Sequence, residues 1–388
     1  MKILTFSTLF PNSQQPGHGI FVETRLRHLL ASGEVEARVV APVPWFPLRH
    51  PRFGKYAKYA AVPRSEVRNG ISVIHPRYPV IPKIGMAVTP LLMAMSVRPA
   101  IARIIDEGYD FDLIDAHYFY PDGVAAAMLA RYFNKPLAIT ARGSDITQLP
   151  QFRAPRKMIQ WAAGRADAVI TVCNALRDEL VTLGVSPERI TALRNGVDLK
   201  LFTPAERSGA ADRPFTLLTV GQLVPVKAQE LIIRALPLLD GVHLKLAGEG
   251  PDRAMLEALV RSLHLESRVD FLGALPQAEL QKHYGQADAM VLASSREGWA
   301  NVLLESMACG TPVVASKVWG TPEVVAAPEA GLLMPERTPQ ALAASVQQLR
   351  ADYPDRAATR RYAERFSWDA TTQGQIDLFQ RMLGRQRA

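Results

Sequence analysis

The sequence has few cysteines. Of its 388 residues, only Cys173 and Cys309 carry a thiol. Two thiols are too few for a disulfide framework or for a four-cysteine zinc site. Both residues lie in apolar runs, so we expect buried free thiols in a reducing compartment.

The sequence also lacks a long apolar run. The longest uncharged one, residues 84–97, ends at Arg98 and contains Pro90, so it falls short of the about 18–20 residues that span a bilayer. The first ten residues hold one lysine and a short apolar run that stops at Pro11, which is typical of a first strand rather than a signal peptide. We therefore expect a cytoplasmic protein that does not cross the cell membrane and can lie peripherally at its inner face.

Several common catalytic motifs are absent. The sequence contains no C-x-x-C, H-E-x-x-H, G-x-S-x-G or G-x-x-x-x-G-K-[ST] pattern. Their absence argues against the commonest zinc-protease, α/β-hydrolase and P-loop chemistries.

Charge is unevenly distributed along a chain that is hydrophobic enough to fold. Hydrophobic residues make up 48% of the sequence and the net charge is +8. Residues 1–200 hold 25 Lys and Arg against 16 Asp and Glu, whereas residues 201–388 hold 20 against 21. A one-sided basic field indicates an anionic partner, such as a phosphorylated substrate, a membrane surface or nucleic acid.

Short β-branched runs alternate with helical patterns in both halves of the chain. This alternation predicts two mostly parallel sheets, each covered by helices on both faces. We expect a first domain over residues 1–200, a second over 201–367 and a linker over 201–214. Ligands of such folds bind where the carboxyl ends of the strands meet, so a cleft between two doubly wound domains is the expected site. The expected strands are Lys2–Phe6, Val35–Val43, Ile71–Ile74, Leu113–Ala116, Leu137–Ala141, Ala168–Val172, Thr216–Val220, Val242–Ala247, Val269–Leu272, Ala289–Leu292 and Val313–Ala315.

The segment Arg296–Pro312 carries the most chemistry. It reads R-E-G-W-A-N-V-L-L-E-S-M-A-C-G-T-P and follows a predicted strand. Asn301 is a good N-cap for the helix that follows, so the amides of residues 301–303 should face an anion or a hydroxyl group. Glu297 precedes this helix and Glu305 lies one turn inside it. Alone, Glu297 could merely offset the helix dipole and Glu305 could be solvated; together, around one amide-rich pocket, they suit a polyhydroxylated ligand.

Two glycine-containing turns follow the first two strands of the second half. The first reads V-G-Q-L-V-P-V-K and ends at Lys227, which can neutralise a diphosphate or be an ordinary exposed lysine. The second is Gly248-Glu249-Gly250-Pro251, where turn formation is the first expectation and ligand contact the second.

In the first half, His117 ends one predicted strand, and Arg142 to Asp145 follow the next. A lone histidine is more often structural than functional, but the carboxyl end of a strand favours function. The pair Asp110 and Asp112 could hold a divalent metal. Because this pair precedes its strand, at the end away from the cleft, we interpret it as a polar strand entrance.

The ordered set of motifs resembles the retaining glycosyltransferase family 4, which has the two-domain GT-B fold. The resemblance runs nearly the full length. Within the family it is most similar to bacterial transferases that build cell-surface or secreted polysaccharides, such as the teichuronic acid branch. It rests on an early glycine loop, the N-G-V-D turn at 195–198, G-Q-L-V-P-V-K, G-E-G-P, the E-x7-E motif from Glu297 to Glu305 and G-T-P-E at 320–323.

The resemblance implies roles for matching positions. Glu297, Lys227 and His117 would be catalytic: Glu297 and His117 would contact the donor sugar, and Lys227 would bind the leaving diphosphate. Glu305 would bind ribose hydroxyls, and the segment containing Leu272 would border the base. The remaining expected substrate-binding residues are Gly17, Gly19, Arg142, Asp145, Gly221, Gln222, Gly248, Gly250, Trp299, Ala300, Asn301 and Val302.

Three positions depart from the commoner family pattern. Gln222 stands where an arginine usually joins the lysine on the diphosphate, Ala228 replaces a frequent glycine, and Arg142 stands where many members carry histidine. A neutral Gln donor makes a weaker hydrogen bond to phosphate than a charged one.

The resemblance further implies a metal-independent hexosyl transfer, with no cofactor, from a UDP- or GDP-sugar to a glycan or lipid-linked acceptor. The first domain would bind the acceptor and the second the nucleotide sugar, and the last helix, residues 368–388, would dock back on the first domain. The alternatives are another GT-B enzyme, a nucleotide-sugar epimerase or a phosphorylase, or a basic protein that binds membranes or nucleic acid. The last would leave the cleft motifs unexplained, so we expect no nucleic-acid partner.

A basic and aromatic segment, residues 45–59, reads W-F-P-L-R-H-P-R-F-G-K-Y-A-K-Y. Cations interleaved with aromatic rings suit the headgroup layer of an anionic membrane, although such a run can also be a solvated loop.

Overall fold

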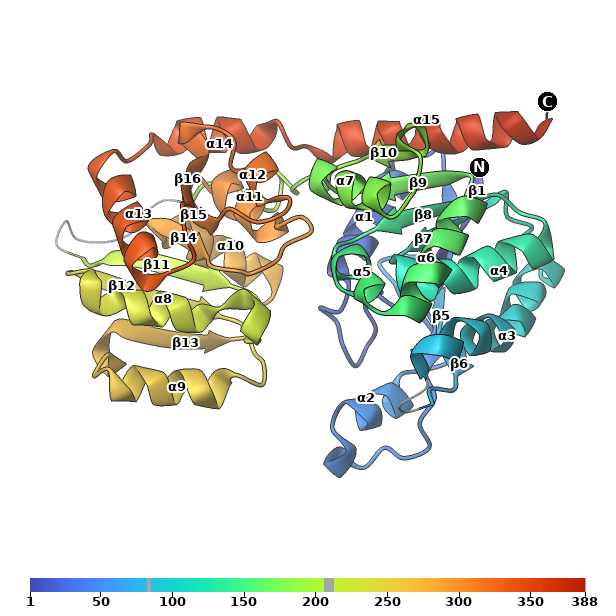
Figure 1. Cartoon of the computed structure of the whole chain (residues 1–388), viewed down its shortest axis with the longest axis horizontal. Helices are drawn as coiled ribbons and strands as arrows, with labels where there is room; N and C mark the ends of the chain where they lie inside the picture. The colour runs from blue at the N-terminus through green and yellow to red at the C-terminus, as the bar shows by residue number, and fades with distance from the viewer. Residues whose placement is uncertain (82–84, 206–212, 388) are drawn as a thin grey trace. The chain divides into compact units, whose positions relative to one another are not determined.

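The computed structural model describes residues 1–81, 85–205 and 213–387, and it divides the chain into two compact units (Figure 1). Unit 1 comprises Met1–Arg194 and Asp369–Ala388, and unit 2 comprises Asn195–Trp368. The predicted boundary at residue 200 lies too late, because the turn that starts at Asn195 belongs to unit 2: its Val197 amide donates to the Phe366 carbonyl. Of the predicted linker, residues 206–212 lie outside the described residues.

Unit 1 is built on an eight-stranded sheet of order β10-β9-β8-β7-β1-β2-β5-β4. All neighbours are parallel except β4, which pairs antiparallel with β5 at the edge. The predicted run 35–43 divides into β2 and the short β3, which pairs with β6. The strands are β1 (Lys2–Phe6), β2 (Glu36–Val40), β3 (Val43–Pro44), β4 (Ser65–Arg68), β5 (Ile71–Ile74), β6 (Arg77–Tyr78), β7 (Leu113–His117), β8 (Leu137–Ala141), β9 (Ala168–Thr171) and β10 (Ile190–Ala192).

Helices cover this sheet, and the C-terminal helix is one of them. Buried residues of α15, including Ile376 and Phe379, share a core with Ile3, Val22 and Leu26. The α-helices are α1 (Ile20–Ala31), α2 (Lys55–Ala61), α3 (Gly85–Asp106), α4 (Val124–Phe133), α5 (Ser144–Thr147), α6 (Arg153–Arg165), α7 (Asn174–Thr182) and α15 (Trp368–Arg387).

Helix α3 corrects the expectation that no segment is long enough to span a membrane. It contains Pro90, Arg98 and Pro99 and continues to Asp106. Among the described residues, it is the one helix that is long and apolar enough to cross a membrane by length and composition. The first residue of the predicted run, Ile84, lies outside the described residues. Met93, Val97, Ile101 and Ile104 on α3 are buried, which is typical of a core helix as well.

Unit 2 is built on a six-stranded parallel sheet of order β13-β12-β11-β14-β15-β16. Its two halves run outward from β11 and β14, so the strand order reverses between these two strands, and ligands of such sheets bind at the carboxyl ends beside that point. The strands are β11 (Phe215–Val220), β12 (Val242–Ala247), β13 (Val269–Gly273), β14 (Ala289–Leu292), β15 (Val313–Ser316) and β16 (Gly331–Met334). The α-helices are α8 (Gln229–Ala235), α9 (Arg253–Ser262), α10 (Gln277–Gln286), α11 (Asn301–Ala308), α12 (Thr321–Val324), α13 (Pro339–Ala351) and α14 (Arg356–Glu364).

Candidate active site

The structure brings Lys227 and Glu297 together at the point in unit 2 where the strand order reverses. Lys227 ends a short 3-10 turn after β11, and Glu297 lies in the loop after β14. The Lys227 ammonium donates to Oε1 of Glu297 at 2.6 Å, and the side chains are 24% and 10% exposed. A charged pair on two neighbouring strand-end loops, part-buried but open to solvent, can present both a cation and a carboxylate to one ligand.

Glycines allow the loops after β11 and β12 to approach each other closely. Gly221 and Gly248 have φ of +150° and +153°. A Cβ on Gly248 would lie 1.8 Å from the Gly221 carbonyl oxygen, and one on Gly250 would lie 2.2 Å from that of Leu223. A Cβ on Gly221 would touch the Lys227 stem at 3.6 Å. The close packing of these two loops, one of which carries Lys227, therefore requires glycine at these positions, independently of any contact with a ligand.

The start of α11 differs from the prediction. Ala300, not Asn301, is the N-cap, and Asn301 is the first helical residue. The amides of Asn301 and Leu303 donate to the carbonyls of Trp299 and Ala300, so two of the three amides expected to face a ligand have partners in the loop. The side-chain oxygen of Asn301 instead accepts from the side-chain Nδ2 of Asn195 at 3.3 Å. Val302 follows as the second helical residue.

Trp299 anchors this turn. It is 7% exposed, and its indole donates to the Asn195 carbonyl at 3.0 Å. The sequence indicated N-G-V-D only as a turn, and the structure shows that Asn195 ties it to the segment before α11.

Glu305 lies within α11 and accepts a hydrogen bond from the Tyr284 hydroxyl at 2.9 Å. Burial raises the pKa of Glu305 to about 7, against the smaller opposite effect of that hydrogen bond. Tyr284, on α10, is fully buried. Sequence reasoning missed Tyr284, because a tyrosine in an amphipathic helix carries no signal of its hydroxyl partner.

The remaining predicted residues of unit 2 lie on the same loops or on β13. Gln222 is exposed, and its backbone carbonyl accepts from Gln229 at 3.0 Å. Ala228 adopts the left-handed conformation, with φ of +51° and ψ of 42°, which glycine enters without the steric cost of a Cβ. Leu272 lies in β13 and is half-buried.

Two buried hydroxyl groups near these loops have no hydrogen-bond partner among the described residues. They are Ser294 Oγ, between β14 and Glu297, and Thr321 Oγ1, at the start of α12. The Gly320 amide donates to the Glu297 carbonyl at 3.5 Å, so the G-T-P-E segment adjoins the β14 loop.

In unit 1, His117 is held on both sides. Arg142 donates to its Nδ1 at 2.5 Å, so Nε2 carries the proton and donates to Asp115 at 3.1 Å. His117 is 1% exposed. Burial lowers the pKa of His117 to about 4, Asp115 opposes this and Arg142 adds to it. The imidazole is therefore neutral at pH 7 and fixed in one tautomer.

A chain of buried polar groups continues from His117 to the C-terminal helix. Asp115 Oδ2 also accepts from Gln375 of α15 at 3.1 Å, and Gln375 accepts from Arg25 of α1 at 2.7 Å. Burial lowers the pKa of Arg142 to about 9 and that of Arg25 to about 10. Sequence reasoning missed Asp115, Gln375 and Arg25. Asp115 stands two residues from His117 in a strand, hence on the same face, which is the signal that could have found it.

The Asp145 carboxylate binds backbone amides and is not exposed to solvent. It is fully buried and accepts from the amides of Phe119, Arg142 and Gly143 at 2.7–3.2 Å. This arrangement fixes the loop after β8 and leaves the carboxylate no exposed oxygen, because both atoms face amides of that loop and of Phe119. Burial raises the pKa of Asp145 and these amides oppose it.

The early glycines occupy different environments. Gly17 is exposed, with open space where a Cβ would be. Gly19 precedes α1 with φ of +69°, and a Cβ there would lie 2.2 Å from the Leu9 carbonyl oxygen. Asp122, which sequence reasoning missed, accepts from the amide and hydroxyl of Thr8 in this region, and burial raises its pKa to about 7.

The pair Asp110 and Asp112 precedes β7. Asp110 pairs with Lys135 at 2.7 Å, and Asp112 accepts from the Lys2 amide at 2.7 Å. These contacts agree with a polar strand entrance. Over residues 1–81, 85–205 and 213–387, no cluster of three or more His, Cys, Asp or Glu could hold a metal ion.

Known proteins resemble this chain along both units. The family model described as glycosyl transferases group 1 matches residues 204–366, and that of glycosyltransferase family 4 matches residues 17–201. The D-inositol 3-phosphate glycosyltransferase of Kineococcus radiotolerans is 33% identical over 70% of this chain and 72% of its own length. TuaC of Bacillus subtilis (strain 168), named as a teichuronic acid biosynthesis glycosyltransferase, is 27% identical over 89% of this chain and 88% of its own length.

Solved structures share the fold. Sucrose-phosphate synthase from Thermosynechococcus elongatus superposes with a TM-score of 0.80 at 22% identity, covering 99% of each chain. HepE of Anabaena, solved in complex with UDP-glucose, superposes with a TM-score of 0.70 at 21% identity, covering 97% of this chain and 98% of that one. With both family models and these folds in agreement, the chain belongs to glycosyltransferase family 4 and has the GT-B fold.

Proposed function

We propose that this glycosyltransferase moves a hexosyl group from a UDP- or GDP-sugar to a hydroxyl of a glycan or lipid-linked acceptor, with retention of configuration and without a metal or other cofactor. The observation that carries the proposal is the Lys227–Glu297 pair, 2.6 Å apart on the loops where the strand order of unit 2 reverses. HepE is named in complex with UDP-glucose, which supports a donor of this class.

In this proposal, unit 2 binds the donor. Lys227 neutralises the diphosphate, whose charge grows as the bond to the sugar breaks, so its attraction is stronger in the transition state than in the ground state. Glu297 and the loop at Trp299 and Ala300 hold sugar hydroxyls. Glu305 binds the ribose and needs its carboxylate ionised to accept from both hydroxyls.

Unit 1 supplies His117 and the acceptor. The neutral imidazole, fixed by Arg142 and Asp115, contacts the donor sugar near the reacting carbon. The acceptor hydroxyl attacks from the face that the diphosphate leaves, which retains configuration. The charge excess of the first 200 residues favours an acceptor that carries phosphate or sits at an anionic surface.

The acceptor side also suits a cytoplasmic enzyme that binds the membrane peripherally in surface-polysaccharide synthesis. TuaC is named for teichuronic acid biosynthesis. In unit 1, Trp45 is 56% exposed and Tyr56 is 43% exposed, beside the cations Arg52 and Lys55 that stack on Phe53 and Tyr56. Aromatic rings next to cations suit the headgroup layer.

Two experiments test the proposal. A thermal-shift screen across UDP- and GDP-sugars identifies the donor, and NMR of the product reports the anomeric configuration. An epimerase would convert the nucleotide sugar without a hydroxyl acceptor, and a phosphorylase would instead require inorganic phosphate as the group that receives the sugar. Product analysis with and without a hydroxyl acceptor, and with and without phosphate, separates these alternatives.

Flotation with anionic vesicles at low salt tests the membrane contact. Replacing Arg49, Arg52, Lys55 and Lys58 with Ser should weaken vesicle binding and leave nucleotide-sugar affinity unchanged. Absence of vesicle binding by the unaltered protein at low salt would contradict the membrane contact.

A further inference from the structure

A cavity in unit 1 is lined by arginines that the proposed transfer does not use. It has a volume of about 430 Å³ and lies between α3 and the strands β2, β4 and β5. Its lining includes Arg38, Arg64, Arg77 and Arg103 but only one carboxylate, Glu107. The sheet order places β2 and β5 on the far side of β1 from β7, which carries His117, so the cavity is separate from the cluster around His117.

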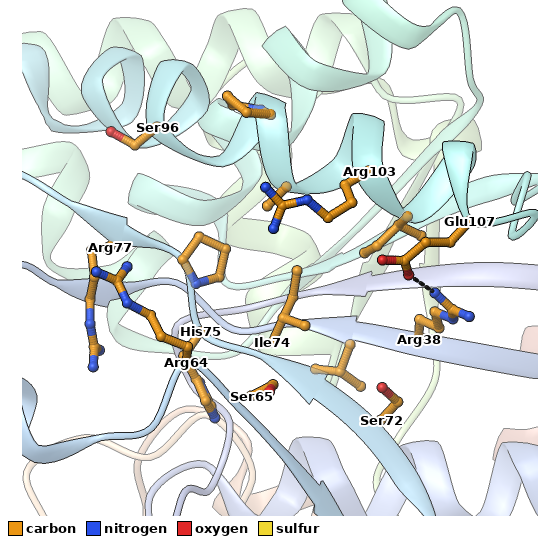
Figure 2. A pocket seen from close by; sticks show the side chains of 15 residues that line it. Arg38, Arg64, Ser65, Ser72, Ile74, His75, Arg77, Ser96, Arg103 and Glu107 are labelled. Carbon is orange, nitrogen blue, oxygen red and sulfur yellow. Dashed lines mark hydrogen bonds and ion pairs between the residues drawn. The ribbon is translucent and has the colours of Figure 1, made fainter.

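The single carboxylate is already paired. Glu107 binds Arg38 at 3.0 Å, and Figure 2 shows this pair at one end of the cavity. Arg64 and Arg77 gather at the other end, and Arg103 reaches from α3 between them (Figure 2). Within the described part of the chain, no carboxylate forms an ion pair with these three arginines.

Arg77 is the most constrained of the three. One of its terminal nitrogens donates to the Val62 carbonyl, while the other, Nη1, is buried and has no hydrogen-bond partner among the described residues. Burial lowers the pKa of Arg77, and the nearby charges of Arg64 and Arg49 lower it further. Like charges held together around an unpaired donor are costly unless an anion joins them.

The same two arginines border a second hollow. Arg64 and Arg77 also line a concavity of about 460 Å³ with Trp45, Phe46 and Arg49. A ligand whose anionic group lies between the arginines would therefore meet aromatic and apolar surface next to it. Serine hydroxyls at Ser65 and Ser72 add hydrogen-bonding groups on the cavity side.

We propose that Arg64, Arg77 and Arg103 form a binding site for a phosphorylated ligand, with a diphosphate as the best-matched group. The planar guanidinium fork matches phosphate oxygens in pairs, and three unpaired arginines suit an anion of more than one charge. A monocarboxylate would leave most of this charge unbalanced. The site does not depend on the sugar-transfer proposal, because none of its residues belongs to the donor loops of unit 2.

Calorimetric titration of the full chain with inorganic pyrophosphate at low ionic strength tests the site. The double variant Arg64→Gln/Arg77→Gln should bind about 10- to 100-fold more weakly, the loss expected for one or two charged hydrogen bonds. Arg103→Gln changes an exposed side chain, so it should weaken binding without lowering the melting temperature even if Arg77 is needed for folding.

Two controls locate the binding. Lys55→Gln/Lys58→Gln removes nearby positive charge outside the cavity and should leave the affinity unchanged. The titration is repeated in Lys227→Ala, which removes the charge proposed to hold a diphosphate on the donor loops. Pyrophosphate binding that persists in this background should be weakened by adding Arg64→Gln/Arg77→Gln. Equal affinity in wild type and in both arginine variants, loss only in Lys227→Ala, or no binding by wild type would each overturn the proposal.

Vesicles identify the source of the phosphate. If the arginine variants also lose binding to phosphatidic acid vesicles while Lys282→Ala, which removes an exposed lysine of unit 2, keeps it, the site takes a lipid phosphate. If only pyrophosphate binding is lost, the site takes a soluble phosphorylated ligand.

Discussion

The cluster around His117 in unit 1 and the cluster around Lys227 in unit 2 were both expected to bind substrate, but their surroundings differ. His117 and Asp145 are almost wholly buried and use their polar atoms on Arg142, Asp115 and backbone amides. Lys227 and Glu297 remain partly exposed on strand-end loops. A change at Asp145, whose oxygens bind backbone amides, should therefore appear mainly in stability, and a change at Lys227 mainly in activity.

The largest expected effect is a loss of turnover when Lys227 is replaced. Lys227→Ala removes the only charge proposed to neutralise the leaving diphosphate, so turnover should fall by about 10²–10³-fold, as when an oxyanion donor is lost. Steady-state kinetics with the identified donor measures this. The control Lys282→Ala removes an exposed lysine of α10 and should leave turnover unchanged. Normal turnover in Lys227→Ala would refute the phosphate role.

Asp145→Ala should act on stability instead. Three backbone amides in a buried loop would lose their acceptor, and the free energy of unfolding should fall by about 4 kcal/mol. Urea denaturation measures this, with Asp178→Ala, an exposed aspartate of α7, as the matched control. A loss no larger than that of the control would show that the carboxylate does not hold the loop.

Glu305 links stability to pH in unit 2. Its pKa is about 7 in the folded protein against an ordinary value of 4.5. The folded state therefore holds a proton that the unfolded state has lost between these values. The free energy of unfolding should fall as pH rises from about 4.5 to 7, by on the order of 3 kcal/mol in total.

Glu305→Gln removes this titration, so the variant should be more stable than wild type at pH 8 and closer to it at pH 4.5. Denaturation at several pH values measures the difference, which also isolates Glu305 from Asp122. Parallel pH profiles for the two proteins would contradict the raised pKa.

Gln375→Leu tests whether α15 supports the His117 cluster. Asp115 and Arg25 would each lose one buried hydrogen-bond partner, which should cost about 2 kcal/mol of unfolding free energy. Gln373→Leu on the same helix is a matched control, because Gln373 is exposed and its side-chain amide donates to exposed Asp377 on the same helix. Equal effects of the two substitutions would mean that the buried contacts of Gln375 contribute nothing.

The smallest expected effect concerns backbone strain in the loop that carries Lys227. Ala228→Gly should raise the free energy of unfolding by about 1 kcal/mol, because glycine enters the left-handed region without the cost that a Cβ brings. Ala254→Gly, at an exposed position inside α9, should lower it by about 0.5–1 kcal/mol. Chemical denaturation of both variants measures the contrast, and a destabilised Ala228→Gly would contradict the strain at this residue.

Much of the fold was predictable because local patterns fix it. Strands such as β1, β5 and β8 have the predicted bounds, because short apolar and β-branched runs between helical segments favour a buried strand. The boundary at Asn195 and the length of α3 were not predictable. The first depends on long-range contacts of Asn195 with Trp299, and the second depends on tolerance of Pro90, Arg98 and Pro99 within one helix.

The candidate site was predictable to a similar degree. Motif spacing placed Lys227 and Glu297 on adjacent loops, because both follow strands of one parallel sheet. The partners of the predicted residues were not predictable: Gln375 is 260 residues from Asp115 in sequence, and nothing in a helical pattern marks one glutamine as buried. The N-cap of α11 was not predictable either, because the amides of Asn301 and Leu303 donate to carbonyls of the loop instead of facing outward.

Direct binding of a nucleotide sugar tests the central claim, that the loops of unit 2 recognise the donor through Lys227. Isothermal titration of UDP- and GDP-sugars into the full chain should show one-site binding of at least one of them, weakened by about tenfold or more in Lys227→Ala, as expected for a charged hydrogen bond to phosphate, and unchanged in Lys282→Ala. Binding of equal strength in wild type and Lys227→Ala, or no binding of any nucleotide sugar, would contradict it.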